Sequence, residues 1–363
     1  MKPIRVLVVD DSFFMRKLIS DFLVESGIIE VIDTAKNGIE AVEKHLRLNP
    51  DVITMDVEMP QMNGLEALEQ IMKKKPVPII MLSSLTKQGT DITVQALQKG
   101  AFDFVAKPSG AISFDIKKVK DELIDKIIIA HRQKEKWHKH LNYNDREETK
   151  AETKTVNCLE IETGHIEGII AIGTSTGGPK ALQEVITKIP KNFPYGILIV
   201  QHMPAGFTKS LATRLNSLSE IEVLEAEDQQ IIKAGTAYIA PGNYHMTVRQ
   251  LQKQFKIELN QNDPVSGHRP SVDVLFQSLA TIRTKKIFVI MTGMGSDGTK
   301  GLTIAKQGEQ VITIGEDETT CVVYGMPKSA IQKGLIDMVI PLHHITNKIL
   351  ESVQKQRRWQ SWI

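Results

Sequence analysis

The sequence GIIAIGTSTGGPKALQEVI occupies residues 168–186 and has the pattern of a strand, a sharp turn and a helix. Its first five residues are apolar, residues 173–178 form a glycine-rich turn, and the remainder has a helical composition. In a G-x-S-x-G elbow, glycines permit backbone angles that a Cβ would forbid, so Ser175 can project above the end of a sheet. The stretch therefore predicts an α/β fold with a serine hydroxyl placed to attack a carbonyl carbon.

The same turn has a second interpretation, because glycine-rich turns between a strand and a helix also bind phosphate. The P-loop pattern G-x-x-x-x-G-K-[ST] is not met, since Pro179 intervenes before Lys180 and no hydroxyl residue follows. The dinucleotide pattern G-x-G-x-x-G also fails, because Ser175 occupies the place of the second glycine. The turn alone leaves both interpretations open, and a nucleophilic serine would need a base and an acid as partners.

Length and composition indicate a globular protein of more than one domain. A chain of 363 residues favours two or three domains, and its 41% hydrophobic and 24% charged residues are typical of globular proteins. Its apolar runs are strand-sized and its N-terminus lacks an export pattern, so we expect a cytoplasmic protein without direct membrane insertion. The net charge of +2 gives no basic excess for nucleic acid. Two cysteines, Cys158 and Cys321, indicate neither a disulfide framework nor a zinc site.

Strand-like and helix-like segments alternate in two regions of the chain. Residues 1–130 hold five strand–helix units, which predicts a parallel (βα)5 sheet with helices on both faces. The polar segment 131–166 has the composition of a linker. Alternation resumes in residues 167–355 and predicts a doubly wound, mainly parallel α/β domain. Within it, residues 244–249 and 255–259 alternate apolar with polar side chains and predict an antiparallel hairpin.

Acids, a hydroxyl and a lysine lie at successive strand ends of the first region. Asp10 and Asp11 follow its first strand, and Asp56 ends its third. Because the carboxyl ends of parallel strands share one edge, these carboxylates should converge, and Mg²⁺ would relieve their repulsion. Ser83 at the fourth strand end and Lys107 after the fifth suit a phosphoryl group. A simpler alternative is that such residues only cap the following helices.

Taken together, these residues resemble the receiver domain of two-component response regulators, which has a flavodoxin-like (βα)5 fold. The resemblance implies that Asp56 accepts a phosphoryl group and that Mg²⁺ is required for this step. The implied metal ligands are Asp10, Asp11, Asp56 and the carbonyl of Glu58. The implied switch residues are Ser83, Phe104 and Lys107.

Two strand ends in the second region offer partners for Ser175. His202 follows the strand-like run 195–200, and Asp297 follows the run 287–291. All three side chains therefore belong to the rim where parallel strands end. Other histidines and acids lack this strand-end placement: His245, His268, Asp228, Asp263 and Asp273. The combination favours nucleophilic catalysis, although the glycines before Asp297 are also what a tight turn requires.

The order serine, histidine, aspartate differs from that of α/β-hydrolases, in which the acid precedes the histidine. The joint pattern instead resembles the catalytic domain of chemotaxis-type protein-glutamate methylesterases, the CheB family. The matching stretches are 173–178, 201–204, 240–242, 268–273, 292–298 and 325–327. Together with the receiver, the resemblance covers nearly the whole chain. Thr174 and Ser296 are mild departures, since alanine is common at both positions.

The resemblance implies that Ser175 is the nucleophile, His202 the general base and acid, and Asp297 the carboxylate that orients His202. The implied substrates are glutamate γ-methyl esters on chemoreceptors, and the family also deamidates receptor glutamines. No cofactor is implied for ester hydrolysis. For the oxyanion we expect the backbone N–H groups of Thr176 and Met294, because both lie in glycine-flanked turns.

A receiver fused to a hydrolase implies control within one chain. The resemblance implies that a chemotaxis histidine kinase donates the phosphoryl group and that phosphorylation at Asp56 loosens a receiver that covers Ser175 at rest. Two alternative functions remain at this point. A DNA-binding response regulator is one, although the second region lacks a compact helix-turn-helix. A non-catalytic adaptor that docks on receptors is the other, and it would share the same fold.

Overall fold

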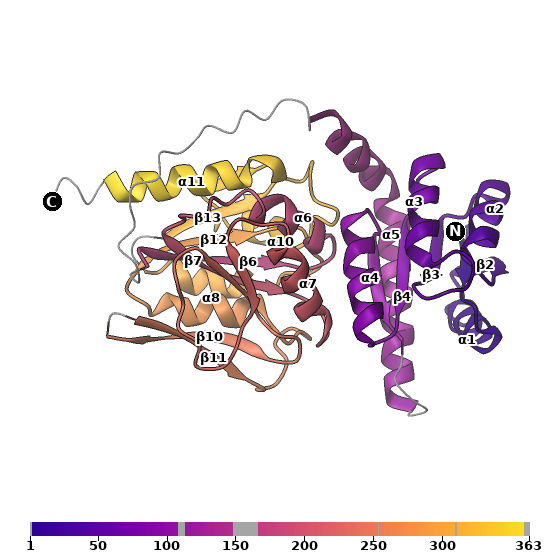
Figure 1. Ribbon diagram of the computed structural model, residues 1–363, viewed down its shortest axis with the longest axis horizontal. Helices are drawn as coiled ribbons and strands as arrows, with labels where there is room; N and C mark the ends of the chain where they lie inside the picture. The colour runs from indigo at the N-terminus through magenta and orange to yellow at the C-terminus, as the bar shows by residue number, and fades with distance from the viewer. Residues whose placement is uncertain (1, 108–112, 148–165, 253, 309–310, 359–363) are drawn as a thin grey trace. The chain divides into compact units, whose positions relative to one another are not determined.

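The computed structural model describes residues 2–107, 113–147, 166–252, 254–308 and 311–358 (Figure 1). The chain forms two compact units, Met1–Lys150 and Ala151–Ile363, and each is described here by itself.

Helix α5 (Ser113–Glu147) extends into the segment that the sequence predicted as a linker. Residues 131–147 are therefore helical, and residues 148–165 lie outside the described ranges. A polar composition is compatible with a helix, because lysine, glutamate, glutamine and arginine are good helix formers and a helix that has begun propagates through them. The predicted division into residues 1–130, 131–166 and 167–355 stays a prediction.

The first unit contains a five-stranded parallel sheet with strand order β2-β1-β3-β4-β5. Every residue of β3 and β4 is buried, as expected for central strands that helices cover on both faces. The order is that of flavodoxin-like folds, which confirms the predicted (βα)5 sheet. The strands are β1 (Ile4–Val9), β2 (Ile29–Ala35), β3 (Val52–Asp56), β4 (Ile79–Ser83) and β5 (Asp103–Ala106).

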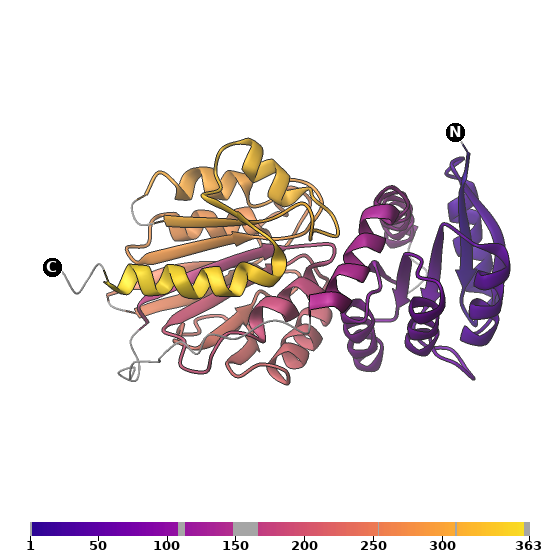
Figure 2. The same ribbon diagram turned by 90° about the horizontal axis from the view of Figure 1, so that it is seen from above.

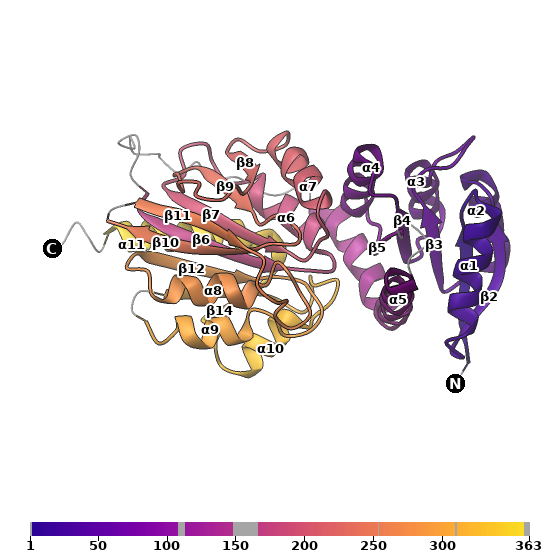
Figure 3. The same ribbon diagram turned by 90° about the horizontal axis from the view of Figure 1, so that it is seen from below.

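Helices cover both faces of this sheet. Helix α1 contacts α5, whereas α3 contacts both α2 and α4 (Figure 3). The side chains of Ser12, Asn37, Asn63 and Thr86 cap the first four helices by accepting a backbone N–H from the first turn. These caps keep the loops at the strand ends short and ordered. The helices are α1 (Phe13–Val24), α2 (Gly38–Leu48), α3 (Gly64–Lys74), α4 (Lys87–Gln98) and α5.

The second unit contains a seven-stranded parallel sheet with strand order β14-β13-β12-β6-β7-β9-β8. Strand β6 lies inside the sheet: β7, β9 and β8 lie on one side of it, and the later strands β12, β13 and β14 lie on the other. The strand order therefore reverses beside β6, which is where doubly wound folds bind ligands. The strands are β6 (Gly168–Thr174), β7 (Tyr195–Gln201), β8 (Glu222–Glu225), β9 (Thr236–Ile239), β12 (Lys285–Ile290), β13 (Val311–Glu316) and β14 (Met338–Ile340).

The predicted hairpin is confirmed, since β10 (His245–Leu251) and β11 (Gln254–Asn260) form an antiparallel pair outside the large sheet. Edge strand β8 was not predicted, because it has only four residues and two of them are glutamates. Helix α8 (Val272–Ala280) contacts both β10 and β6, so it lies between the hairpin and the sheet (Figure 1).

Helices cover both faces of the second sheet as well. Helix α6 (Gly178–Ile186) contacts α11 (Leu342–Arg358), which covers the face of the sheet away from the hairpin (Figures 1 and 2). The remaining helices are α7 (Phe207–Asn216), α9 (Thr299–Ala305) and α10 (Met326–Gln332). None of the helices in the described ranges combines the length and hydropathy that crossing a bilayer requires.

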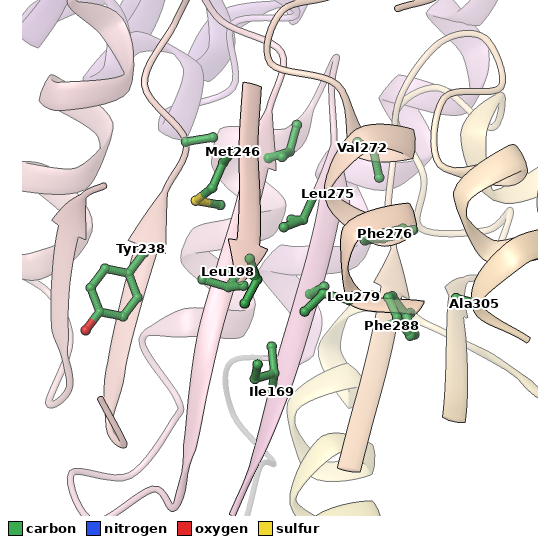
Figure 4. Packing of buried hydrophobic residues seen from close by; sticks show 14 of the residues in the cluster. Ile169, Leu198, Tyr238, Met246, Val272, Leu275, Phe276, Leu279, Phe288 and Ala305 are labelled. Carbon is green, nitrogen blue, oxygen red and sulfur yellow. The ribbon is translucent and has the colours of Figure 1, made fainter. Parts of the chain in front are cut away.

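The main core of this unit surrounds α8 (Figure 4). Side chains from β6 and β7, such as Ile169 and Leu198, pack beneath the helix, and Met246 of the hairpin packs beside it. Phe276 of α8 meets Phe288 of β12 edge to face, with ring centroids 4.9 Å apart. Each such fully buried side chain contributes about 1.5–3 kcal/mol relative to exposure. This packing holds the N-terminus of α8 in a fixed place at the sheet edge.

Candidate active site

Ser175 lies in the turn between β6 and α6, where the sequence predicted the elbow. Gly177 has a φ of +81° and is the N-cap of α6, a left-handed conformation that glycine adopts without steric cost. The Ser175 N–H donates to the carbonyl of Thr292 at 3.0 Å, and the Ser175 carbonyl accepts the Gly178 N–H at 2.8 Å. The backbone is therefore fixed on both sides of the serine side chain.

Gln201, the last residue of β7, ties this turn to the neighbouring strand. Its buried side chain accepts a hydrogen bond from the Thr174 hydroxyl. Through Nε2 it donates to the carbonyls of Ser175 at 3.0 Å and His202 at 3.2 Å. The His202 N–H in turn donates to the carbonyl of Thr174 at 3.2 Å. These bonds join the ends of β6 and β7 and place Ser175 and His202 on one rim.

His202 and Asp297 form a buried pair. Nε2 of His202 lies 2.8 Å from Oδ2 of Asp297, and the two side chains are 7% and 2% exposed. The other ring nitrogen, Nδ1, is buried and has no hydrogen-bond partner among the described residues. When Nε2–H donates to the carboxylate, Nδ1 carries the lone pair and can accept a proton. The ring therefore presents one basic nitrogen to the site.

The Asp297 carboxylate is held at the N-terminus of α8. Burial alone would raise its pKa, but the hydrogen bond and charge of His202, together with backbone N–H groups, lower the pKa to about 2. The backbone N–H groups of a helix N-terminus have no partner inside the helix and favour an anion. The other donors are the N–H groups of Val272 (2.7 Å), Asp273 (2.9 Å) and Gly298 (3.0 Å) and the hydroxyl of Ser271 (2.9 Å).

The loop 292–298, between β12 and α9, lies directly against the serine turn. A Cβ on Gly293 would lie 2.8 Å from the Ser175 Cβ, closer than two such carbons approach in folded proteins. The Thr292 hydroxyl donates to the carbonyl of Thr176 at 2.9 Å. Within the described part of the chain, the Met294 N–H donates to no other group. The two turns that carry the expected oxyanion donors are thus in contact.

In the first unit, Asp10, Asp11 and Asp56 converge at the carboxyl ends of β1 and β3. One carboxylate oxygen from each lies within 4.8 Å of the other two. Lys107 Nζ lies 2.7 Å from Asp10 Oδ2 and 2.8 Å from Asp56 Oδ2. A set of oxygen donors at this spacing fits a hard divalent cation such as Mg²⁺.

Burial raises the pKa of Asp56 to about 6, and the charge of Lys107 opposes this rise only in part. Burial also disfavours the Lys107 ammonium, but the Asp56 and Asp10 carboxylates outweigh that effect and raise the pKa of Lys107. The lysine is therefore a permanent cation between two acids.

The three expected switch positions lie at neighbouring strand ends. The hydroxyl of Ser83, which ends β4, donates to the Ser84 carbonyl at 3.0 Å and accepts from the Thr93 hydroxyl at 2.7 Å. Phe104 of β5 is 4% exposed. The Glu58 N–H donates to Asp56 Oδ1 at 3.4 Å, and the role of the Glu58 carbonyl in metal binding stays a prediction.

The two units match two family models, the CheB methylesterase over residues 170–349 and the response regulator receiver domain over residues 6–115. The chain is 50% identical to the protein-glutamate methylesterase/protein-glutamine glutaminase of Geobacillus kaustophilus, across 97% of this chain and 99% of that protein. This chain belongs to the CheB methylesterase family. The family predicted from the sequence is therefore confirmed.

The chain is also similar to other CheB proteins, over nearly their full length or over the catalytic domain. The Bacillus subtilis protein of the same name is 47% identical, across 98% of this chain and 99% of that protein. The crystal structure of the Thermotoga maritima CheB methylesterase catalytic domain is 46% identical, across 51% of this chain and 97% of that domain, with a TM-score of 0.49. Membership of this enzyme family does not favour the DNA-binding and adaptor alternatives.

Several residues that hold this CheB site together lie in the matching stretches, but the sequence alone predicts no role for them. Gln201, Ser271 and Thr292 were not singled out, because their hydrogen bonds join strand ends that are distant in sequence. His268 was set aside as a loop histidine, yet its ring stacks on that of His202 with centroids 3.8 Å apart and planes within 8°. The signal available was the matching stretch 268–273 itself.

Proposed function

We propose that this chain hydrolyses glutamate γ-methyl esters on chemoreceptors and deamidates receptor glutamines. Ser175 is the nucleophile, His202 the general base and acid, and Asp297 the carboxylate that orients His202. The observation that carries the proposal is the 2.8 Å hydrogen bond between His202 and Asp297, on the rim that bears the serine turn. The names of the relatives, which carry both activities, support the choice of substrate.

In the first half-reaction, the Ser175 Oγ attacks the ester carbonyl while His202 Nδ1 takes the hydroxyl proton. The resulting oxyanion accepts hydrogen bonds from the N–H groups of Thr176 and Met294. When the intermediate collapses, His202 returns the proton to the leaving group, which departs as methanol. A glutamine substrate loses ammonia at the same step. The product is a glutamyl ester of Ser175.

In the second half-reaction, His202 removes a proton from water, which attacks the glutamyl ester and releases glutamate. Asp297 remains ionised throughout, because its pKa of about 2 lies far below any working pH. A fixed negative charge beside Nε2 stabilises the imidazolium that forms in both half-reactions. It also keeps the proton on Nε2, so Nδ1 stays available as the base.

The acidic site of the first unit supports phosphorylation at Asp56 by a chemotaxis histidine kinase. Asp10, Asp11 and Asp56, with the Glu58 carbonyl, would hold Mg²⁺, which when bound neutralises charge on the phosphoryl group. Lys107 lies 2.8 Å from Asp56 and contributes a second positive charge. The phosphoryl group adds about two negative charges. The Ser83 hydroxyl, now bonded to Thr93, can turn to that group and start the change that raises esterase activity.

Release of methanol from methylated receptor membranes tests the proposal. The full-length protein should release methanol, and a small-molecule phosphodonor should raise the rate. Ser175→Ala should abolish release, whereas Ser217→Ala, which alters an exposed serine at the end of α7, should leave it unchanged. Asp56→Ala should retain the basal rate without stimulation. Methanol release by Ser175→Ala would rule out the proposed nucleophile.

A further inference from the structure

Glu316, the last residue of β13, is a fully buried acid that the proposed mechanism does not use. No ion pair with a cation is present among the described residues, and its titratable neighbours are Asp317 and Cys321 on its own segment. Burial raises the pKa of Glu316 to about 7. Burial of a carboxylate without a cation costs free energy of folding. The role of Glu316 therefore lies in the hydrogen bonds that its oxygens accept.

Both oxygens of Glu316 accept hydrogen bonds. Oε2 accepts the backbone N–H of Thr292 at 2.8 Å, and Oε1 accepts the hydroxyl of Thr320 at 3.0 Å. Thr292 is the first residue of the loop 292–298, which follows the neighbouring strand β12. Glu316 therefore anchors the beginning of the loop that bears Met294 and Asp297.

Thr292 transmits this anchor to the serine turn. Its carbonyl accepts the Ser175 N–H at 3.0 Å, and its hydroxyl donates to the carbonyl of Thr176 at 2.9 Å. One residue thus bonds to Glu316 through its N–H and to Ser175 through its C=O. If the Thr292 N–H lost its acceptor, the backbone at Thr292 could shift, and the carbonyl that accepts the Ser175 N–H would shift with it.

We infer that Glu316 is a positioning residue, which fixes Ser175 and the turn bearing Thr176 through the backbone of Thr292. The inference rests on the proposed role of Ser175. Glu316 touches no substrate, so its loss should lower kcat and leave KM nearly unchanged. Displacement of a reacting group by about 1 Å can lower the rate by about a hundredfold, so even a small shift is measurable.

Three substitutions at Glu316 test the inference in the full-length protein. In Glu316→Gln the amide oxygen can accept the Thr292 N–H and the amide nitrogen can donate to Thr320, so kcat should stay within about threefold. Glu316→Leu leaves the Thr292 N–H buried without an acceptor, and kcat should fall about tenfold or more. Glu316→Asp withdraws the carboxylate by one methylene and should also lower kcat. It serves as the test if the leucine variant does not fold.

The matched control is Asp337→Leu. Asp337 also accepts a backbone N–H of β13, that of Thr313 at 2.8 Å, but it has no bond to the serine turn. This variant should keep kcat within about twofold of the wild type. The readouts are kcat and KM for methanol release from receptor membranes and the rate at which a fluorophosphonate labels Ser175.

The outcomes separate this inference from the proposed function. Unchanged kcat and labelling in the leucine and aspartate variants would overturn the positioning role. Equal losses in Glu316→Gln and Glu316→Leu, or a change in KM alone, would overturn it as well. Ser175→Ala is measured in parallel, and methanol release by that variant would instead overturn the proposed nucleophile.

Discussion

Asp56 and Asp297 occupy equivalent places in the two units, since each lies at the carboxyl edge of a parallel sheet, yet their pKa values move in opposite directions. Burial raises the pKa of Asp56 to about 6, although Lys107 lies 2.8 Å away. The pKa of Asp297 is lowered to about 2 despite similar burial, because His202 and fixed backbone donors stabilise the anion.

The number of fixed hydrogen-bond donors explains the difference. Asp56 accepts one backbone N–H, that of Glu58 at 3.4 Å, and the neighbouring Asp10 opposes its ionisation. Asp297 accepts three backbone N–H groups, a serine hydroxyl and an imidazole N–H. A carboxylate has about four lone-pair sites, so Asp297 is saturated and can only orient its partner. Asp56 keeps lone pairs for a metal ion and for attack on phosphorus.

The largest effect should follow from Asp297→Asn. Five donors bond to the two oxygens of this side chain, so an amide nitrogen at either position would face donors, and no charge would remain to stabilise the His202 imidazolium. We expect kcat for methanol release to fall about a thousandfold or more. Asp228→Asn, at an acid outside the site that accepts the Leu259 N–H, should change kcat less than about twofold. If Asp297→Asn kept a kcat above one tenth of the wild-type value, the negative charge held by these donors would not be what orients and stabilises His202.

Gly293→Ala should have the next largest effect. The new Cβ would lie 2.4 Å from Met326 Sδ and 2.8 Å from Ser175 Cβ, so the loop must move away from the serine. We expect a loss of about a hundredfold in kcat and in fluorophosphonate labelling, as for an oxyanion donor that is displaced. Gly308→Ala is the control, since its Cβ would meet nothing closer than 3.4 Å. Normal labelling of Gly293→Ala would show that this contact does not position the serine turn.

Removal of Mg²⁺ should slow phosphorylation at Asp56 in the first unit and leave the reactivity of Ser175 in the second unit unchanged. Chelation with EDTA should lower phosphorylation of Asp56 by acetyl phosphate about a hundredfold, because three carboxylates lose the cation that offsets their charge. Fluorophosphonate labelling of Ser175 in the same sample should stay within about twofold. Restored phosphorylation on adding Mg²⁺ would exclude damage by EDTA. Phosphorylation at an unchanged rate in EDTA would contradict the assigned metal ligands.

Ser271→Ala removes one of the donors that hold Asp297. Ser271 is the N-cap of α8, but its hydroxyl donates to Asp297 at 2.9 Å and makes no cap to its own helix. A single hydrogen bond to a charged group corresponds to about a tenfold loss in kcat. Ser278→Ala, on the same helix and bonded to the Leu275 carbonyl, should leave kcat within about twofold. Equal kcat in both variants would mean that backbone donors alone hold Asp297.

Glu316→Gln should have the smallest effect on turnover but a distinct effect on stability. The folded pKa of Glu316 is about 7, above its ordinary value of 4.5, so the folded state holds the extra proton between these values. Wild-type stability should therefore fall as pH rises from 4.5 to 7 and stay lower above 7, by up to about 3 kcal/mol. The glutamine variant should lack this part of the pH dependence. Urea unfolding at pH 5 and pH 8, followed by hydrogen exchange in β13, measures the difference, and parallel pH curves would contradict it.

The sequence by itself determined the strand-end placement of both sites. Apolar runs are followed directly by Asp10 and Asp56 and, within a few residues, by Ser175, His202 and Asp297. These runs indicated parallel strands, and parallel strands bring their carboxyl ends to one edge. The hairpin was equally visible, because its alternation of apolar and polar residues is local. The strand ends and the hairpin depend on residues that are close in the chain, so composition and spacing are enough to predict them.

Only the tertiary structure decided what surrounds each side chain at those edges. The core packing of α8 brings Ser271 and the first N–H groups of that helix to Asp297, and the pairing of β12 with β13 brings Glu316 to Thr292. The stacking of His268 on His202 likewise joins two loops that are distant in sequence. Such contacts depend on distances between elements far apart in the chain. The sequence therefore names the residues proposed to react, and the packing decides which of their atoms are hydrogen-bonded, charged or left available.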